Sequence, residues 1–272
     1  MSIRFIVSDI DATILPNGGQ FSQITKDAVR ACGEAGILFV LCSGRWYVSA
    51  RRFAEELGIR EGYMIVSNGG AIVDICGHII HSWPIPEEKA LLAWDIMKEF
   101  DTDIITYTRN AIYSANPFRG KTEPERESFL GGAYCTVYGD PEEMRACGLQ
   151  GAFKLAADTE NYEIFPILAA RLREAGFTVS SSHKSNLEIM LPGTGKGAAT
   201  EWLAARLNIP REERMAFGDN TNDLDMFKAV KWSVAVDNAV KSVKEAASLV
   251  TARCEENGVA RIIRQVLAGE IG

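Results

Sequence analysis

Two aspartates, Asp9 and Asp11, directly follow an apolar, β-branched segment at residues 3–7. Residues at positions i and i+2 of an extended chain point to the same side, so this spacing predicts two carboxylates side by side at the end of a strand. Their repulsion is relieved if a cation binds between them or if one of them keeps a proton. Both outcomes suit an enzyme, whereas a strand that simply ends in a solvated acidic turn would produce the same local pattern.

Other polar residues stand where two further predicted strands end and where a predicted helix begins. They are Ser43, Gly44 and Arg45 after the apolar run 37–42, Asp219, Asn222 and Asp223 after the run 215–217, and Lys196 at the start of a helix over 196–207. Carboxylates without His or Cys nearby favour a hard cation, and Mg²⁺ fits such an all-oxygen site. Together with a hydroxyl, loop amides and a lysine, a bound Mg²⁺ would meet the needs of a phosphoryl group.

The elements that must position these residues alternate between apolar strands and helices. Strands are predicted at 3–7, 37–42, 63–66, 215–217 and 232–236, and helices at 22–35, 47–57, 196–207 and 259–267. Continuous apolar runs such as 37–42 are typical of strands that are covered on both faces. The rhythm predicts an α/β fold with a doubly wound parallel sheet, in which ligands bind beyond the carboxyl ends of the strands.

The pattern changes between residues 83 and 188. A long amphipathic stretch at 87–100 precedes short alternating runs, which lie at 104–107, 134–138, 153–156 and 177–180. These runs are typical of antiparallel strands with helices between them, and residues 116–127 are polar enough to form an exposed loop. We therefore expect two domains: a discontinuous sheet domain at 1–82 and 189–272, and an inserted α+β domain at 83–188.

The composition narrows the range of partners. The chain has 272 residues, 47% of them hydrophobic, which is enough for one large core and a smaller one, and its formal net charge is −7. This charge argues against nucleic-acid and membrane-surface partners, which are themselves anionic. Six scattered cysteines without a C-x-x-C pair, and no apolar stretch of about 18 residues, predict a reduced, cytoplasmic protein. The sequence does not indicate an oligomeric state.

Four of these motifs together resemble the haloacid dehalogenase superfamily of phosphohydrolases. The matches, in the family's order, are Asp9-Ile10-Asp11-Ala12-Thr13 with its D-x-D-x-T nucleophile loop, Ser43-Gly44-Arg45 with its hydroxyl loop, Lys196-Gly197 with its lysine, and Gly218-Asp219 through Asn222-Asp223 with its G-D-x-x-N-D loop. The insertion between the second and third motifs resembles the Cof-like subfamily, which carries an α/β cap of the C2 type on a Rossmann-like core.

Smaller segments add to the resemblance, and a few positions depart from it. Asn68-Gly69, residues 236–239 and residues 257–260 look like later segments of the Cof-like subfamily. Alanine at position 12 stands where glycine is usual, serine at 43 where threonine is common, and aspartate at 237 where glycine is general. The first two exchanges are tolerable, whereas Asp237 would alter the edge of the expected site.

The resemblance implies chemical roles for the matching residues. Asp9 would attack phosphorus and form an aspartyl phosphate, and Asp11 would protonate the leaving oxygen and later deprotonate water. Ser43, the Gly44 amide and Lys196 would hold the phosphoryl oxygens while charge redistributes.

The same resemblance implies a Mg²⁺ site made of carboxylates. Asp219 would share the ion with Asp9 and with the backbone carbonyl of Asp11, and Asp223 would lie beside them. Asn222 would support the metal or the phosphate. Arg45 and Lys184 are candidates for substrate contact, and equally for surface charges.

From this resemblance we expect a Mg²⁺-dependent phosphatase that acts on small phosphorylated metabolites such as sugar phosphates. A phosphotransferase or mutase of the same superfamily and a non-catalytic sensor of a phosphorylated ligand are the alternatives. The inserted domain would close over the site and select the substrate. A fold by itself does not specify which substrate that is.

Overall fold

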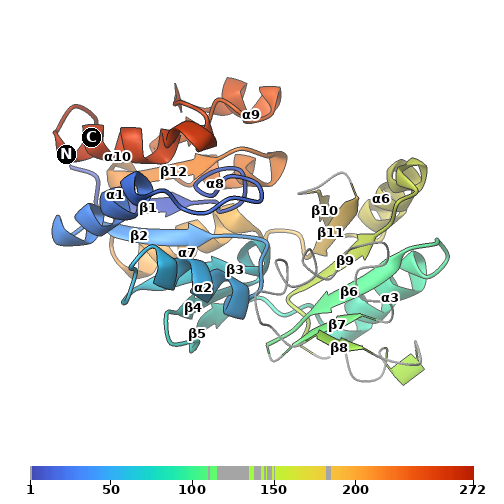
Figure 1. Ribbon diagram of the computed structural model, residues 1–272. Helices are drawn as coiled ribbons and strands as arrows, with labels where there is room; N and C mark the ends of the chain where they lie inside the picture. Colours follow the sequence, from blue (N-terminus) through green and yellow to red (C-terminus); the bar gives the residue numbers. More distant parts are fainter. Residues whose placement is uncertain are drawn as a thin grey trace. The chain divides into compact units, whose positions relative to one another are not determined.

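The computed structural model of the protein describes residues 2–109, 111–114, 135–137, 142–143, 145, 149, 151–181 and 185–272. The chain divides into two compact units, one made of residues 1–81 and 195–272 and the other of residues 82–194 (Figure 1). The predicted loop at 116–127 and the candidate residue Lys184 lie outside the described residues. The strand predicted at 134–138 is described at Cys135–Val137.

The first unit is built on an eight-stranded sheet in the order β14-β13-β12-β1-β2-β3-β4-β5. The strands are β1 (Phe5–Ser8), β2 (Leu38–Cys42), β3 (Tyr63–Val66), β4 (Ala71–Asp74), β5 (Ile79–Ser82), β12 (Arg214–Gly218), β13 (Trp232–Ala235) and β14 (Leu249–Val250). Pairing is parallel from β14 to β3, and β3 pairs antiparallel with β4. The sheet is therefore mixed at one end, because the short η1 turn (Ser67–Gly69) between β3 and β4 cannot carry a parallel crossover.

The order of strands reverses at β1. This strand pairs with β2, the next strand along the chain, on one side and with β12, more than 200 residues later, on the other. All three strands run parallel, so their carboxyl ends lie at the same edge of the sheet. Ligand sites of open α/β sheets form at such a reversal.

Helices connect the strands of the first unit. They are α1 (Gln23–Glu34), α2 (Tyr47–Glu56), α7 (Lys196–Arg206), α8 (Leu224–Lys228), α9 (Lys241–Ala246) and α10 (Gly258–Leu267), with short 3₁₀ turns η3 (Arg211–Glu213), η4 (Thr221–Asp223) and η5 (Cys254–Glu256). Helix α1 begins at Gln23 because the Ser22 hydroxyl caps it and accepts the Thr25 amide at 3.1 Å. Helices α1 and α10 pack together, as do α7 and α8.

The second unit has a six-stranded sheet in the order β10-β11-β9-β6-β7-β8. Its elements are α3 (Glu87–Met97), β6 (Asp103–Tyr107), β7 (Ile112–Ser114), β8 (Cys135–Val137), β9 (Lys154–Asp158), η2 (Tyr162–Ile164), α6 (Phe165–Glu174), β10 (Thr178–Ser180) and β11 (Asn186–Met190). Buried side chains of the two helices and of the sheet, such as Trp94, Leu168 and Leu187, form a core of its own. The boundary expected after residue 188 falls inside β11, and the unit extends to residue 194.

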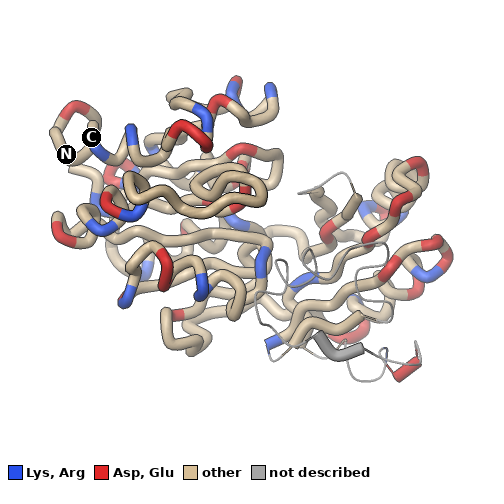
Figure 2. The backbone as a smooth tube through the Cα atoms, viewed as in Figure 1, with Lys and Arg blue, Asp and Glu red and all other residues tan. Residues whose placement is uncertain are grey.

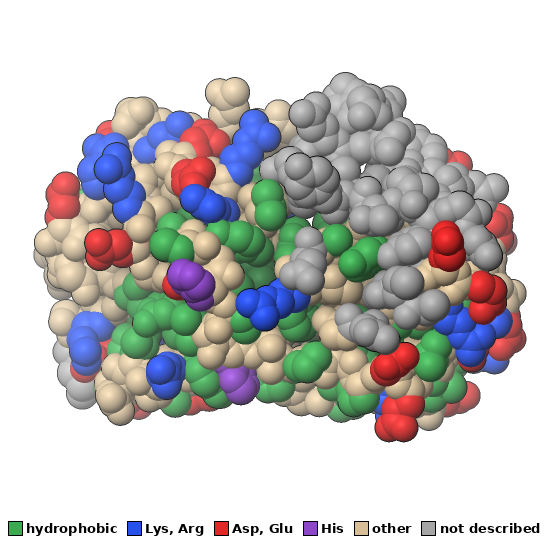
Figure 3. Space-filling view, turned by 90° about the horizontal axis from the view of Figure 1, so that it is seen from below, with side chains coloured by type: hydrophobic (Ala, Val, Ile, Leu, Met, Phe, Trp, Pro, Cys, Tyr) green, Lys and Arg blue, Asp and Glu red, His purple; other side chains and the backbone are tan. Residues whose placement is uncertain are grey.

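Charges of both signs are interleaved along both units (Figure 2), and the face drawn in Figure 3 mixes acidic, basic and hydrophobic side chains. Within the described ranges, every helix is too short or too polar to cross a bilayer.

Candidate functional site

Asp9 lies immediately after β1, at the point where the strand order reverses. Its backbone amide donates to the carbonyl of Phe217 in β12 at 3.0 Å, which continues the pairing of the two strands by one residue. The residue is only 7% exposed. The sheet thus places the Asp9 carboxylate at the edge where the C-terminal ends of β1, β2 and β12 meet.

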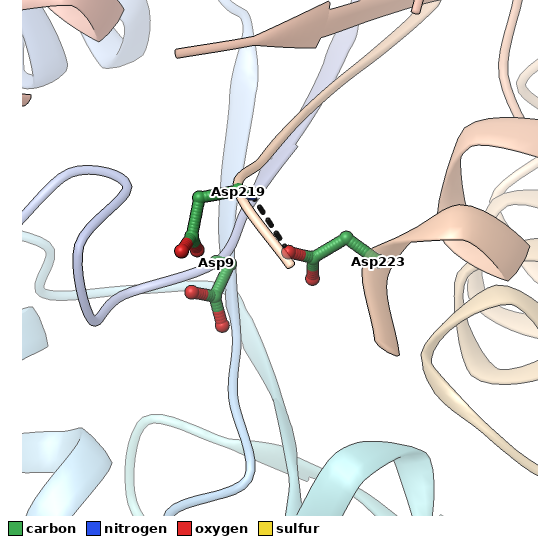
Figure 4. Close-up of side chains that lie close together, drawn as sticks. All are labelled: Asp9, Asp219 and Asp223. Carbon is green, nitrogen blue, oxygen red and sulfur yellow. Dashed lines mark hydrogen bonds between the residues drawn. The ribbon is translucent and has the colours of Figure 1, made fainter. Parts of the chain in front are cut away.

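Three carboxylates gather at this edge: those of Asp9, Asp219 and Asp223, whose oxygens lie within 4.8 Å of one another (Figure 4). Asp223 is held by backbone, because its Oδ2 accepts the amides of Asp219 at 2.9 Å and of Asn220 at 3.1 Å. The Thr13 hydroxyl donates to Asp219 Oδ1 at 2.8 Å. Turn capping after β12 and the loop after β1 therefore fix the directions of two of these side chains.

Lys196 inserts its ammonium group between two of the carboxylates. Its Nζ donates to Asp9 Oδ1 at 2.5 Å and to Asp223 Oδ1 at 2.7 Å, and the residue is 1% exposed. The lysine is the first residue of α7. Asp225 holds that helix start in place, since its Oδ2 accepts the Gly197 amide at 3.0 Å.

Burial and mutual repulsion shift the proton affinities of the cluster. Burial raises the pKa of Asp9 well above its ordinary value, with Lys196 acting against this and the neighbouring carboxylates adding to it. Burial, and then the charge of Asp223, raise the pKa of Asp219 to about 6. Burial disfavours the charge on Lys196, yet Asp223 and Asp9 outweigh it and keep the pKa of the ammonium well above its usual range. The lysine is therefore charged.

The three carboxylates fit a divalent cation. Together with Lys196 they leave two formal negative charges uncompensated within this group of four side chains. A second cation would relieve the repulsion that, together with burial, raises the pKa values of Asp9 and Asp219. All the donors are carboxylate oxygens, which favours Mg²⁺ over softer metals.

The carboxylate of Asp11 has a different partner from that of Asp9. Arg45 grips it with two hydrogen bonds, from Nε to Oδ2 at 2.8 Å and from Nη2 to Oδ1 at 2.7 Å. The side chain of Asp11 is 46% exposed and does not belong to the group of three close carboxylates. The charge of Asp11 nevertheless acts on the cluster and adds to the raised pKa values of Asp9 and Asp219. The chain leaves β1 at Ser8, and Ala12 then turns it with a φ of 58°.

Arg45 is a part-buried residue rather than a surface charge. Its side chain is 14% exposed, its Nη1 donates to the Ser49 hydroxyl at 3.1 Å, and its guanidinium lies 4.8 Å from the centre of the Phe53 ring. These contacts come from α2, so the helix that follows β2 presents the guanidinium to Asp11.

The hydroxyl loop after β2 lies next to the turn after β3. Ser43 is buried, its Oγ accepts the Arg45 amide at 3.1 Å, and its carbonyl accepts the Asn68 amide at 2.9 Å. Asn222 donates from Nδ2 to Asn68 Oδ1 at 3.4 Å. Gly44 lies between Ser43 and Arg45 in this loop. The structure thus joins the predicted residues Ser43 and Asn222 through Asn68.

Sequence reasoning assigned no role to the side chains of Thr13, Asn68, Asp225 and Asn238, all of which contact the site's loops. Thr13 stood inside a recognised motif and Asn68 in a recognised segment, so both carried a signal. The only sequence signal for Asp225 was its position two residues after Asp223. Nothing local in the sequence connects it with Gly197, whose Cα has no room for a methyl group because the Asp225 carbonyl would lie 2.3 Å away.

The open α/β sheet, with buried carboxylates and a lysine where its strand order reverses, places this protein in the general class of doubly wound α/β proteins with a ligand site at the carboxyl ends of the strands. Comparison with known proteins identifies the family within that class. The model of the haloacid dehalogenase-like hydrolases matches residues 6–263, and the chain belongs to this family. The resemblance drawn from the four motifs is therefore confirmed.

Individual relatives cover nearly the whole chain. Phosphatase YwpJ of Bacillus subtilis is 29% identical over 97% of this chain and 100% of its own length. The 5-amino-6-(5-phospho-D-ribitylamino)uracil phosphatase YcsE of the same organism is 27% identical over 97% and 96%. The crystal structure of a haloacid dehalogenase-like hydrolase from Bacteroides thetaiotaomicron superposes with a TM-score of 0.83, at 26% identity over 97% and 100% of the two chains.

Proposed function

We propose that this protein is a Mg²⁺-dependent phosphatase that hydrolyses small phosphorylated metabolites through an aspartyl phosphate on Asp9. The observation that carries the proposal is the buried contact of Lys196 with both Asp9 and Asp223, beside Asp219. An ammonium held among carboxylates at the carboxyl edge of the sheet is suited to receive a phosphoryl dianion. The names of the two Bacillus relatives support the reaction class.

In the first step, an oxygen of Asp9 attacks phosphorus while the bond to the ester oxygen breaks. Lys196 supports the charge on the phosphoryl oxygens, and the Ser43 hydroxyl and the Gly44 amide are the further donors. Mg²⁺ held by Asp9 and Asp219, with Asp223 and the Asp11 carbonyl beside it, would neutralise phosphoryl charge and keep Asp9 ionised.

Asp11 is the proposed acid and base. Its carboxyl group gives its proton to the leaving oxygen, and its carboxylate then takes a proton from the water that attacks the aspartyl phosphate. The side chain is half exposed, which suits contact with both the leaving group and water. In the structure both of its oxygens accept hydrogen bonds from Arg45, so one oxygen must be released before the carboxyl group can carry the proton that it gives.

We also propose that the second unit acts as a cap that selects the substrate, and that the protein is cytoplasmic. Every residue assigned to phosphate chemistry lies in the first unit, whereas the second has a separate sheet and core. Cys32, Cys42, Cys76 and Cys254 are free thiols, which suits a reducing compartment.

The test measures inorganic phosphate released from a panel of phosphorylated metabolites, with Mg²⁺ and with a chelator. The panel begins with sugar and polyol phosphates, because the aminouracil phosphatase is named for a ribityl phosphate. Release that needs Mg²⁺ supports the proposal. Transfer of phosphate to a sugar without release would make the protein a phosphotransferase, and binding without turnover would make it a sensor.

Asp9→Asn tests the nucleophile. The exchange keeps the side-chain size and should lower kcat by about 10³-fold or more, because the covalent route is lost. It also removes one of three mutually repelling carboxylates, so the variant should unfold at no lower temperature than the unaltered protein in chelator. A folded variant that keeps most of its turnover would contradict the role of Asp9.

A further inference from the structure

We infer that Asn238 is a positioning residue for Asp11: it holds the Ala12 peptide in a strained conformation and thereby sets the direction of the acid–base carboxyl group. The inference rests on the proposed function, in which Asp11 protonates the leaving oxygen. Asn238 lies in the turn between β13 and α9, far from position 12 in the chain.

Both polar ends of the Asn238 side chain are used. Its Nδ2 donates to the carbonyl of Ala12 at 2.7 Å, and its Oδ1 accepts the amide of Cys254 at 2.8 Å. The side chain is half-buried and bridges the loop after β1 and the start of η5. The bond to Cys254 orients the carboxamide, so the donor is aimed at the loop that follows β1.

Ala12 needs this support. Its φ of 58° is in the left-handed region, which a side chain disfavours and which glycine adopts freely. The Ala12 amide donates to Leu15 at 2.9 Å and its carbonyl accepts from Asn238, so hydrogen bonds fix the peptide groups on both sides of the strained residue.

The strained residue stands between two residues of the site. Asp11 precedes it and is gripped by Arg45, while Thr13 follows it and donates to Asp219. If the Ala12 carbonyl is released, the backbone can relax toward ordinary φ values, and the carboxyl group of Asp11 then turns with it. Asp9 is held independently, by the β1–β12 pairing and by Lys196. Loss of Asn238 should therefore impair proton transfer more than nucleophilic attack.

Two phosphate esters separate these effects in Asn238→Ala. An aryl ester, p-nitrophenyl phosphate, has a weakly basic leaving group and gains little from an acid, whereas an alkyl ester such as glycerol phosphate depends on protonation of its leaving oxygen. Both esters form the same phosphorylated Asp9 and differ only in the leaving group that departs as it forms. Because kcat/KM covers the steps up to and including that departure, it reports the step in which the two esters differ. We expect the loss for the alkyl ester to exceed the loss for the aryl ester by about tenfold.

Equal losses for the two esters would overturn the inference and leave the phosphatase proposal standing. If the unaltered protein hydrolyses neither ester nor any member of the metabolite panel, the proposed function fails, and the inference fails with it. The matched control is Asn257→Gly, which removes the hydrogen bonds that Asn257 accepts from Ser22 and Thr25 at a left-handed position outside the site. This control should not change the ratio of the two rates.

A second variant tests the strain directly. With Ala12→Gly, the left-handed conformation no longer depends on Asn238, so Asn238→Ala should cost the alkyl ester several-fold less in kcat/KM than it does with alanine at position 12. The same loss in both backgrounds would overturn the inference. If Asn238→Ala fails to fold with alanine at position 12, glycine there should restore folding, and failure to do so would also overturn it.

Discussion

At the scale of single residues, the raised proton affinities of the buried carboxylates decide how the site responds to pH. Asp219 has a pKa of about 6 in the folded protein, against 3.8 for the ordinary side chain, and the pKa of Asp9 is raised as well. Between these two values the folded protein holds a proton that the unfolded chain does not. Without a cation, stability should therefore fall as pH rises through this window.

Mg²⁺ should reverse that trend. The cation binds ionised carboxylates and displaces their protons, so its stabilising effect should be small below pH 6 and should grow as pH rises above it. The measurement is the shift in thermal unfolding temperature on adding excess Mg²⁺, followed across this pH range. Asp219→Asn is the control and should flatten the dependence. A Mg²⁺ shift that is the same above and below pH 6 in the unaltered protein would contradict the assignment of Asp219.

The sequence motifs predict the residues of the cluster but not all of their contacts. The motifs identified Asp9, Lys196, Asp219 and Asp223, which the structure brings together. They did not predict that Asp11 would pair with Arg45, because that contact depends on the chain leaving β1 at Ser8 and turning at a non-glycine residue. No local pattern reports a conformation that is stabilised by hydrogen bonds from distant segments.

At the scale of elements, the site depends on a close approach between η1 and the start of α7. A methyl group on Gly69 would lie 2.1 Å from the carbonyl oxygen of Gly195 and 2.8 Å from the amide of Lys196, and Gly69 has a φ of +90°. Glycine is therefore required twice, for conformation and for space. The turn between β3 and β4 therefore contacts the start of α7 and limits how closely the helix that carries Lys196 can approach.

Gly69→Ala should push α7 away from the carboxylates. We expect a loss of stability on the order of 3 kcal/mol and a drop in kcat/KM of about 10²-fold, because Lys196 moves with its helix. Gly36→Ala is the matched control, since Gly36 has a φ of +74° but no heavy atom within 4 Å of an added methyl group. It should cost about 1 kcal/mol and leave kcat/KM unchanged. Equal effects of the two changes on kcat/KM would show that the contact has no bearing on the site.

Periodicity predicted most of these elements within one or two residues. The helix expected at 196–207 is α7 (Lys196–Arg206), and the strand expected at 215–217 is β12 (Arg214–Gly218). The antiparallel pairing of β4 with β3 was not predicted, although the glycines at 69 and 70 mark a turn too short for a parallel crossover. Apolar runs report which strands are buried, and the direction of pairing depends on the connections between them.

At the scale of the whole molecule, each of the two units contains a buried ion pair between a lysine and a carboxylate. In the second unit, Lys154 Nζ donates to Glu188 Oε1 at 2.7 Å and lies 4.1 Å from the centre of the Tyr107 ring, with both charged side chains only 2% exposed. A buried ion pair contributes little net stability compared with apolar residues of the same size. At this exposure the pair belongs to the interior of the second unit and not to a surface that could contact a substrate.

Replacing residues 83–194 with a short linker should separate chemistry from selection. If the first unit carries all the phosphate chemistry, the shortened chain should still release phosphate from p-nitrophenyl phosphate in the presence of Mg²⁺. This release, together with cooperative thermal unfolding, would show that the shortened chain remains folded. Its kcat/KM values across the metabolite panel should become more alike and should admit bulkier esters, because discrimination is expressed in that ratio. Asp9→Asn in the shortened chain is the control for residual chemistry and should be inactive. If the shortened chain is active and ranks the panel in the same order as the full chain, the first unit selects the substrate and the second unit has another task.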